Sequence, residues 1–389
     1  MTVDPRRASR LKLLVPVGLL LLLSSACVAD APQDSLEPEG PIAREIDNLV
    51  SPVFLIAGVI FVIINLGVLV IMRRYRQRKA DDDTALPKQI HGNLKVELAW
   101  TIVPTLILTV VAVLTVNTIF NIDRAGADAD LHVQVTGKQW WWEYRYDIDG
   151  DGSDDIITAN DLVIPAAQPV ELSITAADVI HSFWVPKLAG KIDAVPGRNH
   201  PLVLESDAPG TFVGQCAEFC GLSHGYMRQR VVALDENDFD DWVANQLEDA
   251  AMPSGGDALA GAELFATQCS QCHLARGIND AEFEELGDGE TVLTAGRAPD
   301  LTHFMTRGAF AGAVFDLWLP SDPPIVEYDD IGRDFNREAL AAWLRDPPAQ
   351  KPMDPQLEPA DPPRGRGMPD LNLTEDQIDQ LIAFLETLE

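Results

Sequence analysis

The chain has 389 residues, 47% of them hydrophobic, so it is long enough for two or three domains with sizeable cores. Its 60 acidic and 29 basic residues give a formal charge of −31, which argues against nucleic acid as a partner and favours a cationic partner or an acidic, solvated surface. The five cysteines form two close pairs and one leftover, Cys27, a pattern unlike that of a disulfide framework.

The N-terminus resembles an export signal over residues 1–27. Basic residues precede the apolar run Leu13 to Leu23, which is too short to be preferred as a membrane span. The sequence "SSAC" follows, so Cys27 would be a lipid-modified residue. A lipoprotein signal usually has a bulky apolar residue where Ser24 stands, so ordinary cleavage near the same place is the alternative.

Two longer uncharged runs, Leu49 to Met72 and Leu98 to Phe120, each exceed the ~20 residues that span a bilayer. The basic segment "RRYRQRK", Arg73 to Lys79, lies between them, and positive residues beside a span stay cytoplasmic. The sequence therefore predicts a transmembrane helix hairpin over residues 46–123 in a bacterial plasma membrane. Everything after about Asn121, where most acidic residues lie, is expected on the extracytoplasmic side.

Short alternating or β-branched runs follow from Leu131 to Leu234, separated by Gly, Pro and Asp, and predict a small antiparallel β-sandwich or barrel. With the helical pattern of Asp235 to Leu247 they form a domain over residues 128–247. Within it, "DIDGDGSDD", Asp147 to Asp155, resembles the start of a calcium loop. Its twelfth position is Thr158 instead of glutamate, so a solvated hairpin tip is the favoured interpretation.

The segment 248–257 has the composition of a linker, and the remaining residues 258–389 are predicted to form an all-α domain. In its last helical pattern, Thr374 can cap the helix and Gln377 stands three residues later.

A C-x-x-C-H sequence near the start of this domain, formed by Cys269, Cys272 and His273, is the attachment signal for haem c in an exported chain. The two thiols add to the haem vinyl groups and the histidine reaches the iron. A zinc knuckle or a thioredoxin-like pair is the alternative, but zinc would need two further ligands and this domain has no other cysteine.

Methionine is the expected sixth ligand of the haem iron. Met368, in a Met-Pro loop before the last helix, is the first choice, because small c-type cytochromes resemble this arrangement. Met353 is the second choice and Met305 a further candidate. His303 could ligate instead, but a polar role near the haem edge is preferred.

The segment "CAEFCGLSHGYM", Cys216 to Met227, carries the other cysteine pair. A disulfide between Cys216 and Cys220 would leave His224 and Met227 unexplained, and zinc disfavours a thioether. Thiolates, imidazole and thioether together favour copper. A second imidazole, His181, stands upstream in "DVIHSFWVP", as in a cupredoxin-like barrel that builds its site from one upstream histidine and a later loop.

Two cysteines, two histidines and one methionine fit two copper ions bridged by both thiolates. Each copper would take one imidazole, Met227 would cap one copper, and the backbone carbonyl of Glu218 would approach the other. Sharing one electron between two metals spreads the geometric change on redox cycling and suits fast electron transfer.

These residues resemble subunit II of the haem–copper cytochrome c oxidases. The resemblance rests on "CAEFCGLSHGYM", "HSFWVPKLAGKIDAVPGR" and "GKQWWWEYRY", and covers Ile46 to Leu247. The added haem domain, with "APDLTHF" at Ala298 to Phe304, looks like the caa3-type branch, in which a cytochrome c is fused to subunit II. The segment between His273 and Ala298 is longer and more acidic than this pattern.

The resemblance implies further roles. Trp140 would be the residue through which electrons reach the copper pair, Glu218 would offer its side chain to a magnesium shared with subunit I, and Glu97 would lie at the mouth of a proton uptake path. A solvated carboxylate is the alternative for Glu97. Three adjacent tryptophans cannot all face one core from a strand, so at least one of Trp140 to Trp142 is expected to be exposed or at an interface.

The expected function is electron transfer within a terminal oxidase, from haem c through a dinuclear copper (CuA) to subunit I, where oxygen is reduced and protons are pumped. Expected partners are subunits I and III, membrane lipid, and a soluble cytochrome c or a bc1-type complex as donor. The spans hold no histidine cluster for an oxygen-reducing site, since His91 lies in the inner loop and His132 and His200 lie later. The alternatives are the equivalent subunit of a CuA-containing nitric oxide reductase, or a copper chaperone or thiol redox module.

Overall fold

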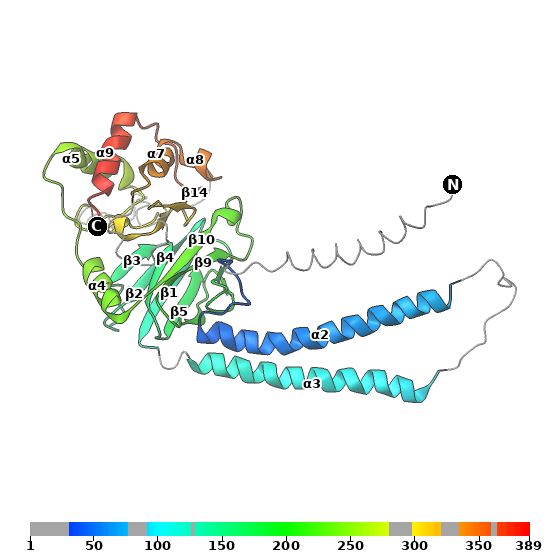
Figure 1. Ribbon diagram of the computed structural model, residues 1–389. Coiled ribbons are helices and arrows are strands. Elements are labelled where there is room, and N and C mark those ends of the chain that lie inside the picture. Colours follow the sequence, from blue (N-terminus) through cyan, green and yellow to red (C-terminus); the bar gives the residue numbers. More distant parts are fainter. Residues whose placement is uncertain (1–30, 77–91, 126–128, 280–297, 320–333, 359–363) are drawn as a thin grey trace, which may run out of the picture.

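The computed structural model describes residues 31–76, 92–125, 129–279, 298–319, 334–358 and 364–389 (Figure 1). The predicted signal peptide with Cys27, the inner-loop His91 and most of the acidic segment before Ala298 lie outside these residues. The described chain forms a pair of long helices, a β-domain, and a C-terminal domain that packs on the β-domain away from the long helices (Figure 1).

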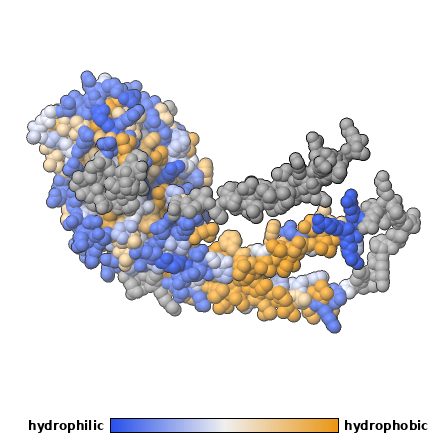
Figure 2. Space-filling view, viewed as in Figure 1, coloured by the Kyte–Doolittle hydropathy of each residue, from blue (hydrophilic) through white to orange (hydrophobic). Residues whose placement is uncertain are grey.

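Helices α2 (Pro41–Arg74) and α3 (Leu94–Ala125) run side by side and project from the β-domain (Figure 1). Both are long and apolar enough to cross a membrane, and their most apolar windows are 0% buried within the chain. Figure 2 shows this hydrophobic surface along both helices. So much exposed apolar side chain is stable in lipid and costly in water, which agrees with a membrane hairpin. Its helices extend beyond the predicted limits of 46 and 123.

The beginning of α2 is attached to the β-domain. The amide of Ala43 donates to the carbonyl oxygen of Leu188 over 3.1 Å. Just before the helix, Gly40 lies against the backbone of Glu205 so closely that a side chain there would collide with the carbonyl group. This close packing fixes where the β-domain stands at the end of the hairpin.

The β-domain consists of two five-stranded sheets, in the orders β3-β2-β1-β5-β8 and β4-β10-β9-β6-β7. The strands of the first sheet are β1 (Leu131–Lys138), β2 (Trp141–Asp147), β3 (Ile156–Ala159), β5 (Val170–Ala176) and β8 (His200–Leu204). Those of the second are β4 (Asp161–Pro165), β6 (His181–Trp184), β7 (Ile192–Ala194), β9 (Gly210–Cys216) and β10 (Arg228–Leu234).

The sandwich is mixed, so the prediction of an antiparallel one is wrong in two places. Strand β1 runs parallel to β5, and β10 runs parallel to β4. The chain leaves the first sheet after β3, forms β4 in the second sheet and then returns to β5, and such a crossover lets a strand enter beside β1 in the same direction.

Side chains alternate between core and surface as the sequence pattern indicates. In β5 every second residue is buried, and the core between the sheets includes the large side chains of Trp142, Tyr144 and Phe183. Helix α4 (Glu236–Gln246) closes one side of this core, where the Trp242 and Tyr146 rings lie 5.3 Å apart.

The described residues of the C-terminal domain form four α-helices and two short strand pairs, so they agree only in part with the predicted all-α domain. Its helices are α5 (Gly256–Leu264), α7 (Arg337–Arg345), α8 (Pro347–Gln350) and α9 (Glu375–Leu385). Two short pairs, β11 (Ala309–Phe310) with β12 (Phe315–Asp316) and β13 (Asp354–Glu358) with β14 (Arg364–Arg366), stand between them. In the first pair a short turn brings the two strands into register, a local event that helical periodicity does not reveal. The predicted capping box of Thr374 and Gln377 is confirmed.

Helices α5 and α9 cross at Gly261. A Cβ atom on this residue would lie 2.8 Å from the Cβ of Phe384, and it would also collide with the backbone of Gln380. Glycine therefore lets the two helices approach closely enough to bury the aromatic pair Phe265 and Phe384, whose rings lie 5.2 Å apart.

We predict that Gly261→Ala lowers the free energy of unfolding of the C-terminal domain by about 1–3 kcal/mol, because overpacking forces the two helices apart. Thermal unfolding of the full chain, followed by circular dichroism, measures the effect. Gly255→Ala is the matched control, since a Cβ there meets nothing within 4 Å. Equal stability of the two variants would contradict the tight crossing.

Candidate metal centre

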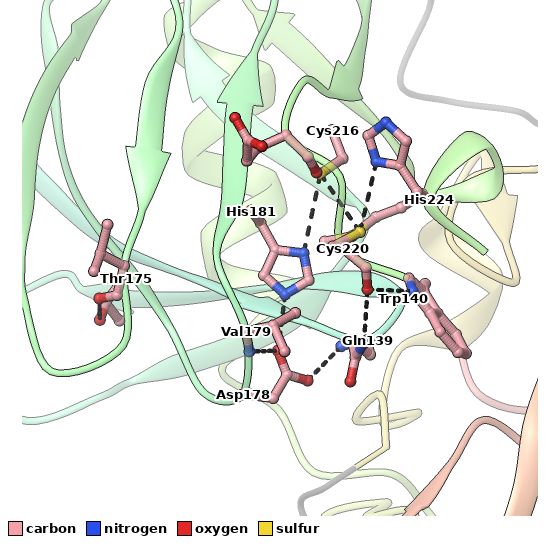
Figure 3. Close-up of polar contacts among 12 residues, drawn as sticks. Gln139, Trp140, Thr175, Asp178, Val179, His181, Cys216, Cys220 and His224 are labelled. Atoms are coloured by element: carbon pink, nitrogen blue, oxygen red, sulfur yellow. Dashed lines mark hydrogen bonds and ion pairs between the residues drawn. The ribbon is translucent and has the colours of Figure 1, made fainter. Parts of the chain in front are cut away.

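Three segments bring soft donor atoms together at one end of the β-domain (Figure 3). His181 begins β6 and Cys216 ends β9, and these strands pair antiparallel with Phe183 opposite Cys216. The loop that follows β9 carries Cys220 and folds back through a short 3₁₀ turn, η2 (His224–Tyr226), into β10.

The two thiols face each other, and each faces one imidazole. The Sγ atoms of Cys216 and Cys220 are 3.8 Å apart, well beyond the ~2.05 Å of a disulfide. Cys216 Sγ lies 4.0 Å from Nδ1 of His181, and Cys220 Sγ lies 3.6 Å from Nδ1 of His224. Met227 presents its Sδ 3.9 Å from Cys220 Sγ. The structure thus brings together all five side chains of the predicted copper set.

Glu218 contributes its backbone and not its carboxylate to this cluster. Its carbonyl oxygen lies 3.2 Å from Cys216 Sγ, whereas Met227 lies against Cys220, and the Glu218 side chain is exposed. Two thiolates, each with one imidazole and one weak donor, are a donor set suited to two copper ions and poorly suited to zinc.

The two thiols shift each other's pKa in opposite directions. The hydrogen bond between them lowers the pKa of the Cys216 thiol, against the opposing effect of burial, with a further contribution from His181. The same interaction and burial raise the pKa of Cys220. Any thiol proton present must leave when a metal binds.

Asp178 orients His181. Its Oδ1 lies 2.8 Å from Nε2 of the imidazole, which turns Nδ1 towards Cys216. Its Oδ2 accepts a hydrogen bond from the backbone amide of Gln139 over 2.7 Å (Figure 3). Burial lowers the pKa of His181, but the hydrogen bonds to Asp178 and Cys216 outweigh it, so the pKa is raised overall. A carboxylate behind a ligating histidine is a common support for metal sites. The spacing "DVIH" was a signal that the sequence analysis did not use.

The Trp140 indole lies over the ligand loop. Its Nε1 donates to the carbonyl oxygen of Cys220 over 3.0 Å, beside a bond from the Gln139 side chain to the same oxygen over 2.6 Å (Figure 3). All three tryptophans are buried, with exposures of 3%, 7% and 0% from Trp140 to Trp142. Trp140 is buried at an interface, because Lys351 of the C-terminal domain donates to its carbonyl oxygen.

The C-x-x-C-H residues lie on a turn that follows α5. Cys269 ends a π-helical turn, η3 (Phe265–Cys269), and its carbonyl oxygen accepts from the His273 amide over 2.9 Å. The His273 Nδ1 lies 2.8 Å from the Pro299 carbonyl oxygen, which can only accept, so Nδ1 carries the proton and Nε2 keeps its lone pair for a metal. Burial lowers the pKa of His273, which keeps the ring neutral, as a haem ligand requires.

The candidate sixth ligands differ in the core that they touch. Met368 and Met305 pack against the core of the C-terminal domain, whereas Met353 packs against the core of the β-domain and also lies against Gly367, next to Met368. His303 is held by backbone groups, with its ring nitrogens 2.7 Å from the Glu389 oxygen and 2.9 Å from the Glu248 oxygen. Met368 and Met305 both lie in the domain that carries His273, so both stay candidates for the axial role.

Two predicted sites outside these clusters have local explanations. Glu97 is exposed in the first turn of α3, and its Oε1 accepts a bond from the Asn93 amide over 3.1 Å, which supports the beginning of that helix. Asp147, Asp149 and Asp151 have carboxylate oxygens within 4.8 Å of one another. Each accepts backbone amides of the hairpin tip, as expected for a solvated turn.

Two family descriptions match the chain. Residues 147–234 match "Cytochrome C oxidase subunit II, periplasmic domain", and residues 33–117 match "Cytochrome C oxidase subunit II, transmembrane domain". The first match contains the ligand loop and the second contains both long helices up to residue 117.

Similar proteins extend the match over nearly the whole chain. Cytochrome c oxidase subunit 2 of Alkalihalophilus pseudofirmus is 32% identical, with 96% of each chain covered. Cytochrome c oxidase subunit 2 of Bacillus sp. strain PS3 is 32% identical over 81% of this chain and 80% of its own. The solved periplasmic domain of subunit II of cytochrome oxidase of Bradyrhizobium japonicum is 32% identical, covering 30% of this chain and 94% of that domain, with a TM-score of 0.28.

We predict that Asp178→Asn lowers the affinity of the site for copper by about 10- to 100-fold, because the support behind His181 is lost. Competition of the copper-loaded protein with a graded series of chelators measures this change. Asp193→Asn, an exposed residue of the neighbouring strand β7, is the matched control. Unchanged copper retention in Asp178→Asn would show that His181 does not depend on this carboxylate.

Proposed function

The chain belongs to the cytochrome c oxidase subunit II family, and from that premise we propose that it passes electrons from a haem c domain through a dinuclear CuA centre to subunit I of a respiratory oxidase. Subunit I would reduce oxygen to water and pump protons. The single observation that carries the proposal is the convergence of two facing thiols, two imidazoles and a thioether under Trp140, where the ligand loop meets strand β6.

When bound, the copper pair would supply a one-electron relay. The chain's own residues prepare the place for it: Cys216 and Cys220 are buried, which keeps bulk water from the thiolates, and Asp178 holds His181 in one orientation. A fixed, dry donor set limits rearrangement when charge changes, which favours rapid transfer. Five converging donors also weigh against a copper chaperone, which must release its metal.

Haem c in the C-terminal domain would accept electrons from outside. The burial of Trp140 supports the proposal. This residue is 3% exposed and is therefore closed to direct contact with a soluble donor. A donor would dock on the C-terminal domain instead. The formal charge of −31 favours a basic soluble cytochrome c, and a bc1-type complex is the other candidate donor.

The membrane hairpin would place both domains on the extracytoplasmic side. Arg73 and Arg74 in the last turn of α2 support a cytoplasmic inner loop. Subunits I and III would cover the apolar faces of α2 and α3. The exposed carboxylate of Glu218 would take part in a magnesium site shared with subunit I, and Glu97 would serve proton uptake from the cytoplasmic side.

We predict that Cys216→Ser removes or converts the dinuclear copper signal and leaves the haem c spectrum intact. Electron paramagnetic resonance of the oxidised full chain, with copper and haem assayed alongside, measures both centres. Cys269→Ser is the reciprocal control and should impair covalent haem attachment while the copper signal remains.

A wild-type signal split by two equivalent copper nuclei, with two coppers per haem, is the expected result. A single-copper pattern, or copper that a mild chelator strips from the wild-type chain, would contradict the dinuclear centre and favour a chaperone.

We predict that Met368→Leu perturbs the sixth coordination position of the haem iron and lowers its reduction potential, because the thioether ligand raises that potential. Absorbance spectra and a potentiometric titration of the full chain test this. Met353→Leu is the matched control and should leave both unchanged. The reverse pattern would transfer the ligand role to Met353.

A further inference from the structure

Lys351 is a lysine buried at the boundary between the two domains. Its side chain is 3% exposed, and its Nζ donates to the carbonyl oxygen of Trp140 over 2.7 Å and to that of Ala311 over 2.9 Å. The first acceptor belongs to the β-domain and the second to the C-terminal domain. Burial lowers the pKa of Lys351 to about 7, which reflects how completely the amine has left water.

The turn between β11 and β12 is shaped to receive this amine. Ala311, Gly312 and Ala313 all have left-handed backbones, with φ of 55°, 79° and 54°. A Cβ on Gly312 would lie 2.5 Å from Lys351 Nζ and 2.6 Å from the Trp140 carbonyl oxygen. Only glycine lets the turn come this close to the Trp140 backbone.

The same two segments of the C-terminal domain, the turn 311–313 and the chain around Lys351, also accept hydrogen bonds from the ligand loop and from the residue after it. The Gly312 carbonyl oxygen accepts from the amide of Arg228, the residue after Met227, over 3.0 Å. The buried hydroxyl of Ser223, inside the ligand loop, donates to the carbonyl oxygen of Pro352. The contact surface of the C-terminal domain therefore converges on Trp140 and on the copper loop.

These contacts form a continuous path of covalent and hydrogen bonds. It runs from the Ala311 carbonyl oxygen through Nζ of Lys351 to the Trp140 carbonyl oxygen. It continues from the Trp140 indole through its bond to the carbonyl oxygen of Cys220. Electron transfer between two centres slows steeply as their separation grows. A contact that keeps the two domains together therefore affects the rate of transfer between them.

We propose that Lys351 is a positioning residue that clamps the turn 311–313 onto Trp140 and so sets the coupling between the haem domain and the copper site. The inference rests on the proposed function, because it assumes that both centres are loaded and exchange electrons. Lys351 itself touches neither centre. It acts by holding the Trp140 backbone and the C-terminal domain in one arrangement.

Two variants weaken the contact between Lys351, the turn 311–313 and Trp140 in different ways. Lys351→Met keeps the length of the side chain and removes its donors, and Gly312→Ala leaves the lysine in place but adds a Cβ where there is no room. Arg337→Met is the matched control, because it also removes one cation from the C-terminal domain, from an exposed ion pair with Asp379 at 2.6 Å.

The first measurement is hydrogen exchange of the metal-free full chain in detergent. The Arg228 amide donates to Gly312, and the Gly308 amide donates to Asp161 over 2.6 Å, so both amides report docking across the boundary. We expect their exchange to accelerate by about tenfold or more in Lys351→Met and Gly312→Ala, since a hydrogen bond to a charged group typically shifts a local equilibrium by that factor. Arg337→Met should resemble the wild type.

The second measurement is the rate of copper reduction in the loaded full chain after photoreduction of the haem. We expect both clamp variants to transfer electrons about tenfold or more slowly, with the copper resonance, the haem spectrum and both potentials unchanged. Direct photoreduction of copper by a ruthenium complex should be as fast as in the wild type.

Unchanged exchange and an unchanged transfer rate in Lys351→Met would overturn the inference while leaving the proposed function in place. Slowed direct reduction, or an altered copper resonance, would also overturn it, by showing damage to the copper site itself. A loaded wild-type chain without haem-to-copper transfer would be a failure of the proposed function, and the inference would fall with it.

Discussion

Strands β6 and β9 pair antiparallel with Phe183 opposite Cys216, and this register places the imidazole of His181 beside a thiol 35 residues later in the chain. A shift by one residue would turn Cys216 to the other face of the sheet and separate the two. The register is held by the core, where Phe183 meets the Trp142 ring edge-on at 5.3 Å. The metal site is therefore a product of sheet packing and not of the ligand loop alone.

Several buried polar groups around the site bond to one another, which makes the site and its surroundings a single unit. The Cys220 carbonyl oxygen accepts from Gln139 and Trp140, and Asp178 accepts from Gln139 while it orients His181. Loss of one partner leaves another buried and unpaired, which costs about 1–3 kcal/mol. A small change in this network should therefore be felt at the thiols.

Polar side chains also meet across the boundary between the domains. Asp161 of the β-domain is buried against it, and burial raises the pKa of its carboxyl group against the opposing effect of Arg230. Arg230 in turn pairs with Asp316 of the C-terminal domain. An apolar interface tolerates sliding, whereas polar groups that meet partners in the other domain favour one arrangement of the two.

The sequence by itself determined the parts that depend on local pattern. Two uncharged runs specify the hairpin, alternation specifies the strands, and the spacing of Cys216, Cys220, His224 and Met227 specifies a soft donor set, since these features depend on residues close in the chain. Periodicity could not reveal the parallel pairing of β1 with β5 or the short strand pairs of the C-terminal domain.

Only the tertiary structure decided which distant residues support the site. Asp178 lies near His181 in the chain, but its second bond, to Gln139, requires the segment before β6 to meet the turn after β1. Lys351 stands 211 residues from Trp140, and no pattern in either segment links them. Long-range partners are chosen by packing and by the need to satisfy buried polar groups, and both are properties of the folded chain as a whole.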